Sequence, residues 1–166
     1  MNPYASHLEG RDPLEVIAET PQQLAQIVRT LDAPALDLSP APGKWSIRQI
    51  LIHLADCELV FAFRLRQALA EGHHTIQPFD QDKWAEHSDA YDTLTALETF
   101  TAARRWNILF LSSLSQEHFA KNVTHPERGT MTLQTIVETM GGHDRNHVKQ
   151  IERIATGGAA TLRAGS

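Results

Sequence analysis

Four long segments in which apolar residues recur every three or four positions are the feature that most constrains the fold of this chain. We expect helices over about residues 12–31, 46–72, 92–114 and 130–155. No stretch shows the strand pattern, and no internal repeat is present. Because the four helices are joined by one long crossover connection, the pattern predicts an all-α four-helix bundle. The chain fits a single domain over residues 1–166, with a loose, Gly- and Ala-rich tail over 155–166.

Local signals set the ends of these helices. Ser46 and Gln49 form a capping box at the start of the second helix. Either Thr130 or Thr132 caps the fourth helix. Pro21 lies inside the first segment, so this segment either kinks there or consists of two helices.

Charge and composition exclude several classes of protein. The formal net charge is −5 and the basic residues are scattered, which argues against nucleic-acid binding. The apolar runs are too short to span a bilayer, so we expect no membrane association. Cys57 is the only cysteine, so no intramolecular disulfide can form. With no signal peptide recognised at the N-terminus, these features indicate a cytoplasmic protein.

Two histidines in the last helix, His143 and His147, are four residues apart on its core-facing stripe. Imidazoles one turn apart project side by side and can chelate one metal ion. A lone pair with this spacing is more often two core histidines than a metal site. Two buried imidazoles without a partner are costly, however, and a bound cation removes that cost.

A third histidine, His53, lies on the flank of the apolar stripe of the second helix and points into the bundle. Together with His143 and His147 it predicts a metal site. Asp56 follows one turn later and is a candidate base, a candidate extra ligand, a carboxylate that orients a ligand, or simply a solvated residue. We expect Cys57 to be a small buried core residue rather than a nucleophile.

Other residues near these histidines suggest supporting roles. Asp144 could orient a histidine ring, with Asn146 and Gln150 as alternatives. Gly141 and Gly142 should each cost about 1 kcal/mol relative to Ala inside a helix. Close approach of a neighbouring helix, or access to the site, would explain them.

The connection over residues 73–91 is long for so small a domain, which is typical of functional or mobile loops. It carries Phe79, Asp80, Asp82 and Trp84. We expect it to cover the site and to help select the substrate.

Two motifs give the chain a family resemblance. The run PGKWSIRQILIHLAD from Pro42 to Asp56, with GHDRNHVKQIE from Gly142 to Glu152, resembles the DinB/YfiT-like superfamily. The resemblance implies a DinB-like four-helix bundle and a divalent metal, nickel or zinc, on His53, His143 and His147. It also implies dimers, and chemistry that ranges from metal-dependent hydrolysis to S-transfer or isomerisation with low-molecular-weight thiols such as bacillithiol or mycothiol.

Three neutral histidines leave an open position on the metal, which is the layout of a catalytic site. We therefore expect a metal-dependent hydrolase or thiol S-transferase acting on a small molecule, with Asp56 as the nearest candidate base. The alternative is a non-catalytic, metal-binding, dimerising bundle with a role in stress. An accessible metal with an exchangeable ligand would separate the two.

Overall fold

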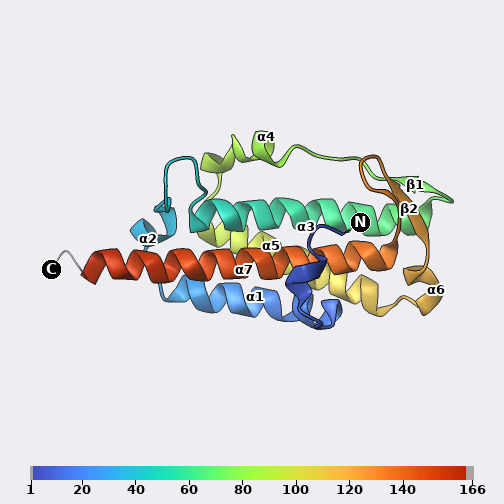
Figure 1. The fold of residues 1–166 in the computed structure, drawn as a ribbon, viewed down its shortest axis with the longest axis horizontal. Coiled ribbons are helices and arrows are strands. Elements are labelled where there is room, and N and C mark those ends of the chain that lie inside the picture. The colour runs from blue at the N-terminus through green and yellow to red at the C-terminus, as the bar shows by residue number, and fades with distance from the viewer. Residues whose placement is uncertain (1, 164–166) are drawn as a thin grey trace.

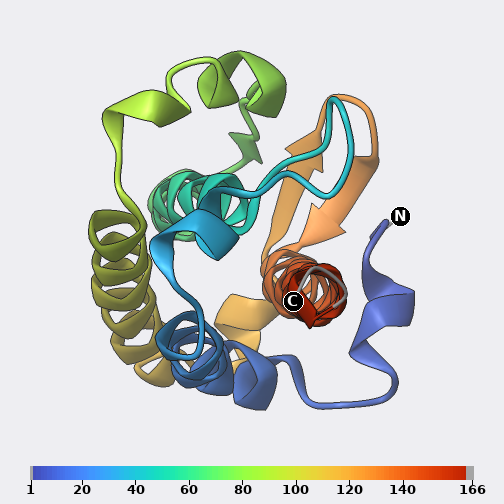
Figure 2. The ribbon, with the colours of Figure 1, turned by 90° about the vertical axis from the view of Figure 1, so that its left-hand side faces the viewer.

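The computed structural model describes the backbone of residues 2–163 and the side chains of residues 2–157. Figure 1 shows four long helices packed lengthwise, which confirms the predicted all-α four-helix bundle. They are α1 (Pro13–Arg29), α3 (Ile47–Ala70), α5 (Thr93–Ser112) and α7 (Leu133–Arg163). Figure 2, which looks along the bundle, shows these helices side by side, with the N-terminal segment on the outside of α7.

The predicted capping signals are present. Ser46 and Gln49 make the reciprocal bonds of a capping box before α3. A further cap is Asp12, whose side chain accepts a hydrogen bond from the Leu14 amide at the start of α1. Pro21 lies inside α1, which continues as one helix, so the two-helix alternative is wrong.

Short elements occupy the connections. They are the 3-10 helix η1 (Ala5–Leu8), α2 (Ala33–Asp37), α4 (Gln81–Ala85), the 3-10 helix η2 (Ser88–Ala90) and α6 (Gln116–Phe119). In Figure 1, α4 lies across the outer side of α3, within the connection that was expected to cover the site.

A small sheet at one end of the bundle was not predicted. It consists of β1 (His74–Thr75), β2 (Asn122–His125) and β3 (Gly129–Thr132), in the order β1-β2-β3. β1 pairs with β2 in parallel, and β2 with β3 antiparallel. Strands of two to four residues are too short to show a recognisable alternation in sequence.

The last helix is longer than the sequence suggested. It begins after Thr132, whose hydroxyl accepts a hydrogen bond from the Thr135 amide, and it continues to Arg163. The predicted end near Ala155 is therefore wrong. Residues 164–166 of the expected loose tail lie outside the described residues. None of the described helices is long and apolar enough to cross a membrane.

Candidate metal centre

The three predicted histidines lie where α3 faces α7. His53 projects from α3 and the other two from α7, and all three side chains are buried. The Nε2 atoms of His53 and His143 are 3.0 Å apart. The His147 ring centroid lies 4.9 Å from that of His53 and 4.5 Å from that of His143. The fold thus brings together three imidazoles from two helices.

Cys57 lies beside the same rings, as well as in the buried core where it was expected. Its Sγ atom is 3.5 Å from His53 Nε2 and 3.9 Å from His143 Nε2. Among the described residues, His53, Cys57 and His143 are the group whose ligand atoms all lie within 4.8 Å of one another. Burial raises the pKa of the thiol well above its usual range, and neighbouring carboxylates raise it further.

The environment of the histidines keeps them neutral. Burial, together with the smaller effect of the charge on a protonated His147, lowers the pKa of His53 to about 3. Burial also lowers the pKa of His143 and that of His147. Neutral imidazole is the form that binds metals, so all three rings are ready to act as ligands near pH 7.

Hydrogen bonds to the second ring nitrogens differ between the two histidines of α7. His147 Nδ1 lies 2.9 Å from Gln150 Oε1, so Gln150 orients this ring and leaves Nε2 for a metal. His143 Nδ1 is buried and has no hydrogen-bond partner among the described residues. A cluster of neutral imidazoles, one with an unpaired nitrogen, fits the donor set of a divalent transition metal.

Asp56 lies on α3 beside this cluster, partly buried. Burial raises the pKa of its carboxyl group. It lines a small pocket together with His53, Phe79 and Trp84, and the free volume of that pocket is about 10 Å³. The connection that carries α4 therefore reaches His53, next to Asp56.

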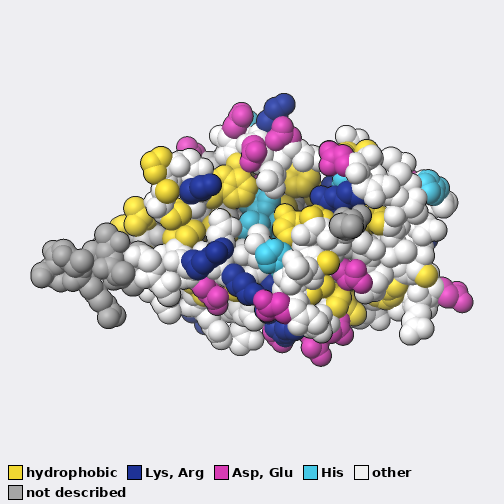
Figure 3. Space-filling view, in the orientation of Figure 1, with side chains coloured by type: hydrophobic (Ala, Val, Ile, Leu, Met, Phe, Trp, Pro, Cys, Tyr) yellow, Lys and Arg dark blue, Asp and Glu magenta, His cyan; other side chains and the backbone are white. Residues whose placement is uncertain are grey.

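Two aromatic rings flank the histidines on another side. The Trp45 ring centroid lies 4.9 Å from that of His53, and Tyr4 packs edge-on against His143 at 5.1 Å. Figure 3 shows histidine side chains at the centre of this face, between hydrophobic ones. Tyr4 was missed in the sequence, because nothing local links the N-terminal segment to the helix it covers.

The glycine pair of α7 explains how Tyr4 reaches the site. A Cβ atom on Gly142 would collide with the backbone carbonyl of Tyr4, and one on Gly141 would press on Leu8 and Pro13. The close approach that we expected from a neighbouring helix is therefore made by the N-terminal segment and the start of α1.

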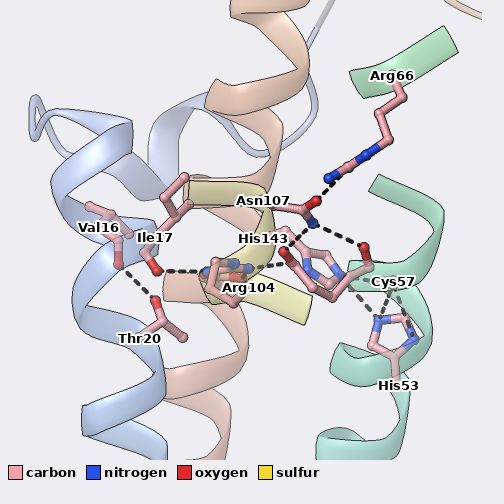
Figure 4. A network of polar contacts seen from close by, with 11 residues as sticks. Val16, Ile17, Thr20, His53, Cys57, Arg66, Arg104, Asn107 and His143 are labelled. Carbon is pink, nitrogen blue, oxygen red and sulfur yellow. Dashed lines mark hydrogen bonds and ion pairs between the residues drawn. The ribbon is translucent and has the colours of Figure 1, made fainter. Parts of the chain in front are cut away.

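A buried ionic network lies directly behind the histidines, and Figure 4 shows it in place. Arg104 of α5 donates to Glu58 of α3 over 2.7 Å and to both carboxylate oxygens of Asp144 of α7. Asn107 Nδ2 donates to Glu58 Oε1 over 2.8 Å. The expectation that Asp144 orients a histidine ring is therefore wrong, because its oxygens bind Arg104. The guanidinium holds together the two helices that carry the histidines.

The same arginine accounts for the proline inside α1. Pro21 has no N–H, so the Ile17 carbonyl loses its usual helical donor. Arg104 donates a 2.9 Å hydrogen bond to that carbonyl instead. A proline and an arginine far apart in sequence thus complement each other, a relationship that helical periodicity cannot reveal.

Comparison with known proteins agrees with this architecture. The family model described as the DinB superfamily matches residues 17–151. A protein of Bacillus cereus named "Putative metal-dependent hydrolase" is 32% identical over 146 residues, covering 85% of this chain and 82% of its own. A protein of the same name from Bacillus anthracis is 31% identical, with the same coverage.

A solved structure has the same fold. YfiT from Bacillus subtilis, described as "a probable metal-dependent hydrolase with an unusual four-helix bundle topology", superimposes with a TM-score of 0.81. It is 25% identical, and the match covers 87% of this chain and 84% of YfiT. The family match, the relatives and the shared bundle together establish that this chain belongs to the DinB superfamily.

Proposed function

We propose that this protein is a metal-dependent enzyme that holds one divalent ion on His53, His143 and His147. The observation that carries this proposal is the convergence of three buried, neutral imidazoles from two helices. The names of the similar Bacillus proteins support the metal-dependent, hydrolytic part of it. Nitrogen donors favour nickel or zinc over magnesium or calcium.

The proposed reaction is hydrolysis of a small molecule, or transfer of a low-molecular-weight thiol to one. A bound divalent ion supplies Lewis-acid activation of a water or a thiol. Asp56 is the candidate proton acceptor, because it shares a pocket with His53 and burial raises its pKa. Phe79 and Trp84 close that pocket and exclude bulk water.

We further propose a homodimer in the cytoplasm. Helices α3 and α5, which pack against each other, carry four large apolar side chains that are each at least half exposed: Leu59, Phe63, Trp106 and Leu109. Exposed apolar side chains gathered in this way are typical of a protein interface. The free Cys57 thiol, close to His53 and His143, suits a reducing compartment.

The test begins with the metal and continues with activity. Purified protein should carry close to one divalent ion per chain by elemental analysis. His143→Ala and His147→Ala should lose most of it, whereas His87→Ala, at an exposed position, should not. Esterase, amidase and thiol-transfer screens would then compare the metal-loaded protein with the metal-free protein.

The alternative function is a non-catalytic metal-binding bundle that acts in stress through dimerisation. It is favoured if the loaded protein is inactive in every screen and its ion does not respond to added thiols or anions. Full metal occupancy in both alanine variants would refute the assignment of the site itself.

A further inference from the structure

We propose that Cys57 is a fourth ligand of the ion, so that the resting site is closed by three histidine nitrogens and one thiolate. The inference rests on the proposed function, because it concerns the same ion. It goes beyond the three-histidine site by assigning a protein group to the position otherwise left to water or substrate.

The separations between donor atoms carry the argument. Around a tetrahedral ion with ordinary bond lengths, two nitrogens lie about 3.3 Å apart, and a nitrogen and a sulfur about 3.6 Å apart. The observed distance between the two Nε2 atoms of His53 and His143 is 3.0 Å. The Cys57 Sγ atom lies 3.5 and 3.9 Å from them. All three separations are therefore close to the donor–donor distances expected around one tetrahedral ion.

Helix geometry supplies the fourth corner. Cys57 follows His53 by four residues on α3, just as His147 follows His143 on α7. Each helix therefore presents two donors one turn apart on the face that meets the other helix. Donor atoms of His53, Cys57 and His143 form the close group, and the ring of His147 lies beside it, with centroids 4.9 Å from His53 and 4.5 Å from His143. The two facing pairs therefore offer four donors, whereas three histidines alone use only one member of the α3 pair.

Charge supports the same assignment. Three neutral imidazoles leave the full charge of a divalent ion in a buried place, and a thiolate offsets half of it. To hold the ion, the Cys57 thiol would release its proton to solvent, and the sulfur would keep the electron pair of the S–H bond. A substrate would then need either an additional position on the ion or the place of the thiolate.

Cobalt(II) loading tests this proposal. Because the chain has one cysteine, a sulfur-to-cobalt charge-transfer band in the near-ultraviolet can come only from Cys57. The wild type should show the band at one cobalt per chain. Cys57→Ser and Cys57→Ala should lose the band yet still take up cobalt, with an affinity lower by at least about tenfold. Their far-ultraviolet circular dichroism should match the wild type.

The possible failures are distinguishable. A wild type that takes up one cobalt without the band overturns the role of Cys57 and leaves the three-histidine site intact. A band that persists in Cys57→Ala overturns it as well. If the wild type takes up no metal at all, the proposed function fails together with this inference. Alkylation provides a second readout, since metal should protect the wild-type thiol under mildly denaturing conditions.

Discussion

Tyr4 meets His143 edge-on, with the two ring planes at 90° and the centroids 5.1 Å apart. The N-terminal segment thereby covers one side of the candidate metal centre, although it lies outside the four-helix bundle. The contact depends on Gly142, because the backbone of Tyr4 occupies the space where a Cβ atom would lie.

Gly142→Ala should destabilise the protein by about 1–3 kcal/mol, the usual cost of overpacking, because the Tyr4 backbone has to move. Urea denaturation followed by circular dichroism measures the change. Gly157→Ala on the same helix is the matched control, since its Cβ would meet nothing within 4 Å. That control should be neutral or stabilising by up to about 1 kcal/mol. Equal effects of the two changes would contradict the packing role of Gly142.

Asp56→Asn should reduce the activity of the metal-loaded enzyme by about 10²- to 10⁴-fold, the usual contribution of a general base. The ion should stay bound, because the proposed ligands are the three histidines and Asp56 only lines the pocket beside His53. The measurement is kcat at fixed metal occupancy. Glu98→Gln, at an exposed position on α5, is the control and should keep its activity. Loss of the metal from Asp56→Asn would instead identify Asp56 as a ligand.

The metal-free protein should lose stability in acid. The pKa of His53 in the folded state is about 3, and those of His143 and His147 are also lowered from the ordinary value of 6.5. As the pH falls, these histidines therefore bind protons in the unfolded chain at a higher pH than in the folded chain. The stability that is present above pH 6.5 is consequently lost as the pH falls towards 3. Urea midpoints between pH 8 and pH 4 test this.

His53→Gln is the variant that isolates the effect. It removes one of the groups whose pKa changes on folding, so its urea midpoint should depend less steeply on pH than that of the wild type. An identical slope in both proteins would show that His53 does not contribute.

Arg104→Met should destabilise the protein by about 3–5 kcal/mol, because Glu58 and Asp144 would remain buried without a counter-charge. The free energy of unfolding in urea measures this. Arg105→Met, on the exposed side of the same helix, should change it by no more than about 0.5 kcal/mol. A small loss in Arg104→Met would show that the carboxylates find other partners or protonate at little cost.

Phe63→Ser combined with Trp106→Ser should convert the proposed dimer into a monomer. The side chains of Phe63 and Trp106 are 55% and 65% exposed. Arg66 of α3 lies over the ring of Trp106 of α5 at 5.9 Å, so it connects the two helices that carry these side chains. Analytical ultracentrifugation gives the mass of each form. Leu38→Ser, at an exposed position on another part of the surface, should leave the mass unchanged. A monomeric wild type would contradict the dimer.

The sequence was sufficient for the four helices and for placing each histidine on the inner face of its helix, because both depend on local periodicity. Ser46 and Gln49 lie within one helical turn, and the spacing of His143 and His147 puts them on one face whatever packs against it. The small sheet escaped prediction because its strands are too short to show an alternation and because one of its two pairings joins distant residues, such as His74 and Val123.

The partners of buried polar groups could not be predicted for the same reason. Arg104 looked like an ordinary charged helix residue, and only the fold reveals that it joins α1, α3 and α7. Similarly, Asp144 adjoins His143 in sequence, but the turn of the helix directs its carboxylate to the arginine. Tyr4 reaches the site from a segment that carries no motif.

The small pocket between Asp56 and Trp84 has a kinetic consequence. Its 10 Å³ is room for about one water molecule, far less than any organic substrate needs. A substrate that enters by this route has to wait until α4 and the Phe79–Trp84 ring pair move aside, so its association rate is set by that opening and falls below the diffusion limit. The same movement is needed for a ligand to leave, so a ligand bound beneath α4 would have a long residence time.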